Sequence, residues 1–132
     1  MSSFFPEVGG AQVTANNLGR FLVSRGHTVT VLVSPKYWRV LGDQKNNFPF
    51  KIVPMFPASQ SAIPRLGAAY LKVQDFYLGY LQRKYKFDVW QSFGTYPTGV
   101  SVGHFTHPRK IPHVVRTVGY DIQIDKEIGY GY

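Results

Sequence analysis

The sequence predicts an α/β fold in which short parallel strands alternate with helices. One observation is that runs of β-branched and other apolar residues recur along the chain, at 27–34, 50–56, 87–93 and 113–119. A second is that apolar residues return at helical spacing between these runs, at 11–25 and 64–85. Alternation of this kind favours a parallel sheet with helices on its faces.

The first helix is predicted at 11–25, and Gly26 supplies the left-handed residue that ends many helices. The segment HTVTVLVS (27–34) is apolar nearly throughout, as expected of a strand covered on both faces, and Pro35 closes it. Residues 37–47 are predicted to form a loop with one short helical turn. The segment FKIVPMF (50–56) is predicted as a second strand, which Pro54 restricts to an edge or cuts short.

A polar linker at 57–63 is expected to lead into the longest helix, from Pro64 to Tyr85. Proline suits the first turn of a helix, and the basic residues after position 82 suit its negative end. One broad face of this helix is expected to be apolar and to carry Leu66, Ala69, Tyr70, Val73, Phe76, Tyr77, Tyr80 and Leu81.

The remaining elements are predicted as a strand at 87–93, a turn at 94–99, a short helix at 98–106, a strand at 113–119 and a loop-like tail. In parallel sheets, ligands bind beyond the carboxyl ends of the strands. The residues at those ends are Ser34, Phe93, Gly94 and 119–121.

Composition limits the classes of protein that this chain represents. Its 132 residues are 44% hydrophobic, which suits one globular domain and argues against disorder. It has no cysteine, so disulfides and thiolate metal sites are excluded. Its net charge of +8 favours acidic partners such as phosphorylated molecules or anionic lipid. No nucleic-acid recognition motif accompanies that charge, and no apolar run is long enough to span a membrane.

The pair Gly9-Gly10 directly precedes the first predicted helix. Backbone N–H groups at a glycine-rich helix start form an anion site, although a simple tight turn is the alternative. A dinucleotide fingerprint is not matched, because the glycine spacing differs and the first predicted strand ends in Ser34-Pro35-Lys36 without an acid. A P-loop is not matched either, since no Gly-Lys-Ser/Thr triplet occurs.

Two further groups of residues have weaker chemical meaning. His104 and His107 lie three positions apart, but no third ligand is near them in sequence, so no metal site is expected. Ser92 lacks the Gly-x-Ser-x-Gly context of a hydrolase nucleophile. His113 begins a strand and is expected to be structural.

Three stretches together resemble glycosyltransferase family four enzymes. The stretch FFPEVGGAQVTANNLGRFLVSRGHTVTVLV is similar to the opening of that family, with its glycine turn, amphipathic helix and apolar strand. The stretch FDVWQSFGTYPTG looks like the strand and loop that face the acceptor, and IPHVVRTVGYDIQIDKEIGYG is similar to the segment that ends the same N-terminal domain. The resemblance covers essentially the whole chain.

This resemblance implies the N-terminal, acceptor-side half of a GT-B enzyme, a Rossmann-like domain whose first strand is largely missing here. The family uses a nucleotide-sugar donor, transfers the sugar with retention to a glycan or lipid-linked acceptor, and generally needs no metal or other cofactor. Carried onto this sequence, the donor phosphates would lie at Gly9 and Gly10. The acceptor and cleft would be lined by Gly94, Tyr96, Arg116 and Gly119, and Asp121 is the candidate catalytic residue.

One position departs from the family pattern. Many relatives place a histidine just before the glycine that matches Gly119, and this chain has Val118 there, which cannot hydrogen-bond a sugar hydroxyl. Arg116 is a candidate to compensate. One alternative is a degenerate, non-catalytic homologue, which Val118 favours. Another is a nucleotide-binding Rossmann module, which lacks the motif that it needs.

The ends of the chain carry a further expectation. A donor-binding C-terminal domain is absent from these 132 residues, so they are expected to be inactive alone. Because most of the first buried strand is also missing, they are expected to be poorly folded alone. The whole enzyme is expected in the cytoplasm, with its basic surface at an anionic membrane face.

Overall fold

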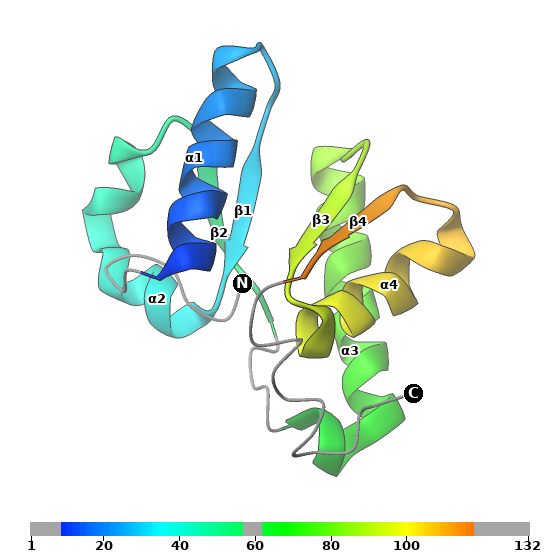
Figure 1. Ribbon diagram of the computed structural model, residues 1–132. Coiled ribbons are helices and arrows are strands. Elements are labelled where there is room, and N and C mark those ends of the chain that lie inside the picture. The colour runs from blue at the N-terminus through cyan, green and yellow to red at the C-terminus, as the bar shows by residue number, and fades with distance from the viewer. Residues whose placement is uncertain (1–8, 57–61, 118–132) are drawn as a thin grey trace. The chain divides into compact units, whose positions relative to one another are not determined.

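A computed structural model describes residues 9–56 and 62–117 (Figure 1). The chain divides into two compact units, Met1–Ala58 and Ser59–Tyr132, and each has its own pair of parallel strands. Most of the linker predicted at 57–63 lies outside the described residues, and so does the predicted tail.

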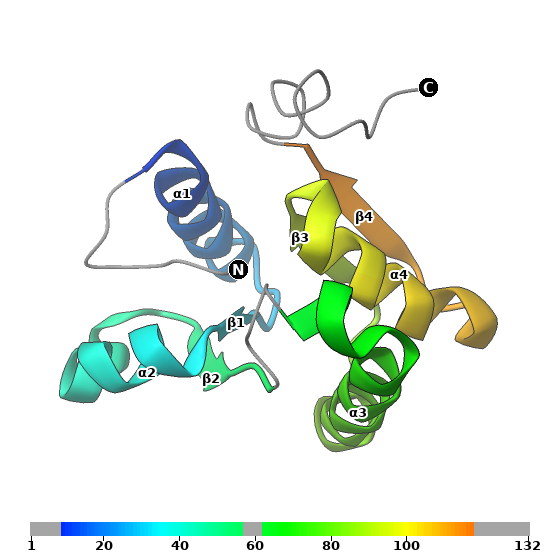
Figure 2. The same cartoon turned by 90° about the horizontal axis from the view of Figure 1, so that it is seen from below.

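The first unit contains, in chain order, α1 (Gly10–Ser24), β1 (Thr30–Val33), α2 (Pro35–Leu41), the 3-10 helix η1 (Gly42–Asn47) and β2 (Lys51–Pro54). β1 and β2 pair in parallel, with Thr30 opposite Lys51 and Val33 opposite Pro54. α2 belongs to the connection between the strands and packs against β2 (Figure 2). Parallel strands joined through helices confirm the predicted α/β class.

The end of α1 shows why β1 is shorter than predicted. Gly26 has a φ of +86°, as predicted for the residue that ends the helix. Its N–H donates to the carbonyl of Val23 at 2.9 Å, and the N–H of His27 donates to the carbonyl of Leu22 at 3.1 Å. These two hydrogen bonds form a Schellman cap. His27 therefore belongs to the helix end, and the strand starts only at Thr30. Of its four residues only Val33 is fully buried, so the expected cover on both faces is not seen in the described residues.

The segment after β1 is more helical than predicted. Pro35 does close the strand, and it also begins α2, a position where proline loses no hydrogen bond. The first helical bond runs from the N–H of Trp38 to the carbonyl of Ser34 at 3.0 Å. The prediction of a loop with one short turn over 37–47 was therefore wrong. β2 ends at Pro54, as predicted.

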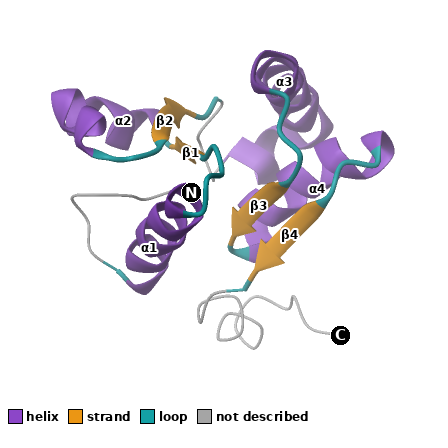
Figure 3. Ribbon diagram, turned by 90° about the horizontal axis from the view of Figure 1, so that it is seen from above, coloured by secondary structure: helices purple, strands orange, loops and turns teal. Residues whose placement is uncertain are grey.

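The second unit contains α3 (Ala62–Tyr85), β3 (Trp90–Phe93), the π-type turn η2 (Thr95–Gly99), α4 (Val100–Thr106), the 3-10 turn η3 (His107–Arg109) and β4 (His113–Arg116). The helical path of α3 breaks at Gly67. β3 and β4 pair in parallel, with Trp90 opposite His113 and Phe93 opposite Arg116. α3 and α4 lie on the same side of this strand pair, and α4 packs against both strands (Figure 3).

The core of the second unit forms around the rings of Trp90 and Phe105. Their centroids lie 5.5 Å apart in an edge-to-face arrangement. Leu78 and Leu81 of α3 are fully buried beside this core. The indole N–H of Trp90 donates to the side-chain oxygen of Gln82 at 2.7 Å, which ties β3 to α3.

The apolar face predicted for α3 is only partly correct. Tyr70 and Leu81 are buried, together with Gln74 and Leu78, so the buried face follows positions four and three apart. Val73, Phe76 and Tyr80 are instead exposed, with 59%, 76% and 45% of their surface accessible. The helix carries two sets of apolar side chains, one buried and one exposed, and helical spacing alone predicted a single broad face.

None of the helices in the described parts of the chain combines the length and the apolar character that a bilayer crossing requires.

Candidate functional site

The carboxyl ends of β3 and β4 meet at one edge of the second unit. Phe93 lies opposite Arg116, and the N–H of Gly94 donates to the carbonyl of Arg116 at 2.9 Å. Gly94 has a φ of +95°, a conformation that favours glycine, and it turns the chain sharply out of the strand. The arrangement brings two of the predicted cleft residues side by side, with the Arg116 side chain exposed.

The turn after Gly94 is held in a fixed shape by close contacts. A Cβ atom on Gly99 would lie 2.9 Å from the carbonyl oxygen of Gly94 and 3.3 Å from Val115, so the turn folds back on the strand ends. The hydroxyl of Ser101 donates to the carbonyl of Pro97 at 3.0 Å. This turn carries Tyr96, whose side chain is 42% exposed. The predicted cleft residues Gly94, Tyr96 and Arg116 therefore share one sheet edge.

Reasoning from sequence placed Tyr70 only on the apolar face of α3 and did not single out Gln74. Burial raises the pKa of Tyr70, and the phenol of Tyr96 raises it further. Gln74, one helical turn later, is buried, and its side-chain oxygen has no hydrogen-bond partner. A glutamine within an otherwise apolar buried face was the signal in the sequence that could have marked this position.

The start of α1 lies in the first unit and has the features of an anion site. Gly9 is the extended cap residue, and it has no side chain to satisfy the first N–H groups. The first helical bond runs from the N–H of Val13 to the carbonyl of Gly9 at 3.0 Å. No acidic residue lies in the first turn. Among the described residues, none has an atom within 4 Å of a Cβ atom on Gly10, whereas a Cβ atom on Gly9 would lie 2.6 Å from the side-chain oxygen of Gln12.

Ser92, which is buried, and His113, which is half-buried, form a hydrogen-bonded pair between β3 and β4. Ser92 Oγ lies 2.9 Å from His113 Nε2, and Ser92 is 1% exposed. Burial lowers the pKa of His113. The pair joins the strands, which agrees with the structural role predicted for His113.

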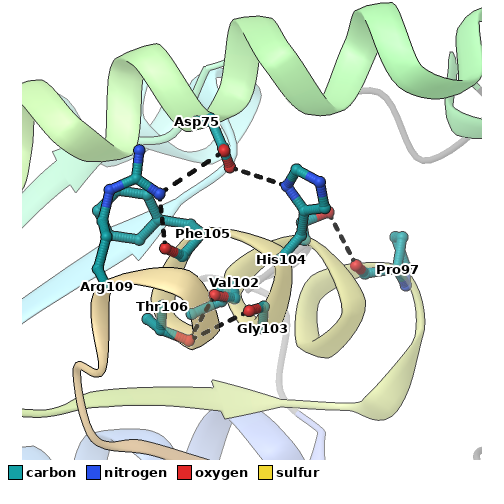
Figure 4. A network of polar contacts seen from close by, with 9 residues as sticks. Asp75, Pro97, Val102, Gly103, His104, Phe105, Thr106 and Arg109 are labelled. Carbon is teal, nitrogen blue, oxygen red and sulfur yellow. Dashed lines mark hydrogen bonds and ion pairs between the residues drawn. The ribbon is translucent and has the colours of Figure 1, made fainter.

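His104 takes part in a polar network between α3 and α4 (Figure 4). Its Nδ1 lies 3.2 Å from one carboxylate oxygen of Asp75, and the guanidinium of Arg109 lies 3.7 Å from the other. Arg109 also donates to the carbonyl of Phe105 at 2.7 Å. Within residues 9–56 and 62–117, no cluster of three or more potential metal ligands occurs.

The remaining predicted residues, Val118, Gly119 and Asp121, lie outside the described residues.

Comparison with known proteins gives a family but no individual relative. Neither the curated proteins nor the solved structures contain a match to this sequence. The family model described as Glycosyltransferase Family 4 matches residues 8–118, a range that includes the start of α1 and the edge formed by β3 and β4. Because the match covers most of the 132 residues, the chain belongs to glycosyltransferase family 4.

Proposed function

We propose that this chain is the acceptor-side domain of a retaining glycosyltransferase with GT-B architecture. The enzyme would transfer a sugar from a nucleotide-sugar donor to a glycan or lipid-linked acceptor. Family membership supports the reaction class. The observation that carries the placement of the acceptor is the convergence of Gly94, Tyr96 and Arg116 at the carboxyl edge of β3 and β4, where parallel sheets bind ligands.

The acceptor side of the proposal depends on an exposed phenol and an exposed cation. Tyr96 offers a ring face for packing on a sugar and a hydroxyl for hydrogen bonding. Arg116 offers a guanidinium that donates several hydrogen bonds to sugar hydroxyls or to a phosphate. We place Gly119, three positions after Arg116 in the chain, in the same cleft. The neighbouring Tyr70 of α3 would support the position of Tyr96.

The donor side of the proposal uses the start of α1. Negative charge on the diphosphate grows as its bond to the sugar breaks, and N–H groups at a helix start stabilise such charge. Neither Gly9 nor Gly10 carries a side chain, so phosphate oxygens would reach the backbone there once the Gln12 side chain beside Gly9 turns away. Asp121 is the proposed catalytic residue, and no metal or cofactor is required.

We propose that a separate donor-holding domain completes the enzyme, so that residues 1–132 alone do not turn over. The test uses the longer protein that would contain this chain. It is incubated with UDP-, GDP- and ADP-hexoses, and the released nucleoside diphosphate is measured with and without glycan or lipid-linked acceptors. We expect acceptor-dependent release from one donor, with the product sugar keeping its anomeric configuration.

Two variants test the acceptor edge. Tyr96→Phe and Arg116→Gln should each raise the acceptor KM by roughly tenfold, the effect of losing about one hydrogen bond to a charged or polar group. The donor KM should change little. Arg39→Gln is the control, because Arg39 is an exposed basic residue of α2, outside the proposed edge. Equal acceptor KM values in all four proteins would remove this edge from the proposal.

The second candidate function is a degenerate homologue that keeps the fold without the chemistry. Val118 favours it, because a valine cannot contact a sugar hydroxyl through a hydrogen bond. A folded protein that binds nucleoside diphosphates but releases none from any donor would support this candidate over the enzyme.

We also propose that the enzyme acts in the cytoplasm at an anionic membrane face, where a lipid-linked acceptor would be available. The net charge of +8 supports an anionic surface as a partner.

A further inference from the structure

α3 carries a line of exposed apolar side chains that its own unit leaves uncovered. Val73, Phe76 and Tyr80 lie three and four positions apart, which aligns them along one side of the helix. Phe76 is 76% exposed, the highest value among the exposed large apolar residues. We call these three residues the α3 stripe. Most large aromatic side chains bury much of their surface, so this exposure calls for a partner.

The α3 stripe differs from the face that holds the core. At 100° per residue, the buried residues Tyr70, Gln74, Leu78 and Leu81 cluster on a different side of the helix. Substitution of the stripe should therefore leave the core in place. Variants of the α3 stripe can therefore be tested for binding while the protein stays folded.

Basic side chains flank the α3 stripe on both sides. By the same 100° spacing, Lys72 and Arg83 fall on one side of it and Lys84 on the other, and all three are exposed. The ammonium of Lys84 lies 3.3 Å from the hydroxyl of Tyr80 and therefore stays next to the stripe. Asp75, the one acid of α3, points instead to His104 and Arg109 (Figure 4).

Charge decides which partner fits this surface. A second copy of the chain would bring two sets of lysine and arginine side chains together, and like charges repel. An anionic lipid surface supplies phosphates for the basic side chains and an apolar layer for the valine, phenylalanine and tyrosine. This combination is typical of helices that lie flat in a membrane interface. We propose that the α3 stripe, flanked by Lys72, Arg83 and Lys84, docks α3 along an anionic membrane surface.

This inference deepens the membrane part of the proposed function by naming the surface that makes contact. The membrane-docking inference is tested without donor or acceptor. A negative vesicle experiment therefore leaves the proposed sugar transfer untouched, and a negative sugar-transfer assay leaves the docking inference untouched.

The first experiment is sedimentation of the purified protein with vesicles. One set contains about a quarter phosphatidylglycerol in phosphatidylcholine, and the other contains phosphatidylcholine alone. We expect binding to the anionic set that weakens in high salt. Lys72→Gln with Lys84→Gln should reduce binding roughly fivefold per charge removed. Val73→Ser with Phe76→Ser should reduce it at least as much.

The matched control is Val40→Ser with Val89→Ser. These valines are 57% and 54% exposed but lie outside α3, so the control removes apolar surface elsewhere. It should bind vesicles like the unmodified protein. Equal binding by the stripe variant and the control would overturn the proposal, because the attraction would then come from overall charge.

A second readout places one residue in the lipid. The fluorescence of the tryptophan added in Phe76→Trp should be quenched by vesicles of brominated phosphatidylglycerol, and that of the tryptophan added in Val89→Trp should not. Each variant is compared with the unmodified protein, which has two tryptophans of its own. Absence of quenching at position 76 would overturn the proposal. So would self-association of the free protein that Phe76→Ser abolishes, or a clear fall in melting temperature of Phe76→Ser, because either result would show that protein covers the stripe.

Discussion

Ser92 and His113 are joined by a hydrogen bond of 2.9 Å between Oγ and Nε2, although 21 positions separate them in the chain. The parallel pairing of β3 and β4 brings them together. Ser92 is almost wholly buried, so its hydroxyl has no access to bulk water, and the histidine supplies its partner. The pair fixes the two strands whose ends form the proposed acceptor edge.

The first prediction concerns pH and His113. Burial lowers the pKa of this histidine below its usual value of 6.5, so the unfolded chain takes up a proton that the folded chain resists. The free energy of unfolding should therefore fall as the pH drops through about 6.5, and it should keep falling until the lower, folded-state pKa is reached. Urea denaturation between pH 8 and pH 5, roughly the range in which histidine titrates, checks this.

His113→Gln should remove that part of the pH dependence, because glutamine does not titrate in this range. It should also lower stability at pH 8 by about 1–3 kcal/mol if the buried Ser92 loses its partner. His107→Gln is the control, since His107 is exposed. An unchanged pH profile for His113→Gln would contradict the assignment.

The second prediction concerns the turn that carries Tyr96. Gly99→Ala places a methyl group 2.9 Å from the carbonyl oxygen of Gly94, a backbone atom that cannot move without shifting the turn. We expect a loss of about 1–3 kcal/mol in stability, as for other overpacked positions. Gly103→Ala of α4 is the matched control, because its methyl group would meet no neighbour closer than 3.8 Å. Similar melting temperatures for the two variants would show that the turn is adaptable.

The third prediction separates two glycines inside helices. Gly19 of α1 is buried against Phe50, and an added methyl group would lie 2.8 Å from its ring. Since Phe50 is itself buried, Gly19→Ala should destabilise the first unit by about 1–3 kcal/mol. Gly79→Ala of α3 meets its neighbours only at 3.8 Å and should stabilise the second unit by about 0.5–1 kcal/mol through helix propensity. Urea denaturation of both variants measures the difference between their changes in stability. A Gly19→Ala variant as stable as the unmodified protein would show that Phe50 moves aside freely.

The fourth prediction tests the start of α1 as the donor-phosphate site. Gly10→Asp adds a carboxylate at the first residue of the helix, where negative charge favours the helix by about 0.3–1 kcal/mol. The same charge should repel a diphosphate and weaken binding of a nucleoside diphosphate by roughly tenfold. Calorimetric titration measures the affinity for the nucleoside diphosphate, and thermal melting measures the stability of the variant. Asn17→Asp, further along α1, serves as the control, and equal affinities for both variants would count against the site.

Local sequence was sufficient to predict the end of a helix or strand wherever a single residue determines the backbone conformation. Gly26 ends α1 through its left-handed conformation, Pro54 ends β2, and the β-branched runs form strands near the predicted positions. Three of the predicted cleft residues, Gly94, Tyr96 and Arg116, also come to one edge, because the two strands that they end or follow were correctly identified. Strand length was predicted less well, since the helix cap at His27 and the helix start at Pro35 both shorten β1.

Tertiary structure alone decided which face of each element is covered. In α3, helical spacing groups Val73 and Phe76 with Tyr70 and Leu81, yet only the second pair is buried, because burial depends on where α4 and the strands lie. The bond between Ser92 and His113 likewise depends on strand pairing across 21 positions. Amino-acid sequence determined the family, the order of elements and their breaks through local backbone preferences. Packing between segments far apart in the chain decided which side chains meet at the proposed acceptor edge and which stay exposed on α3.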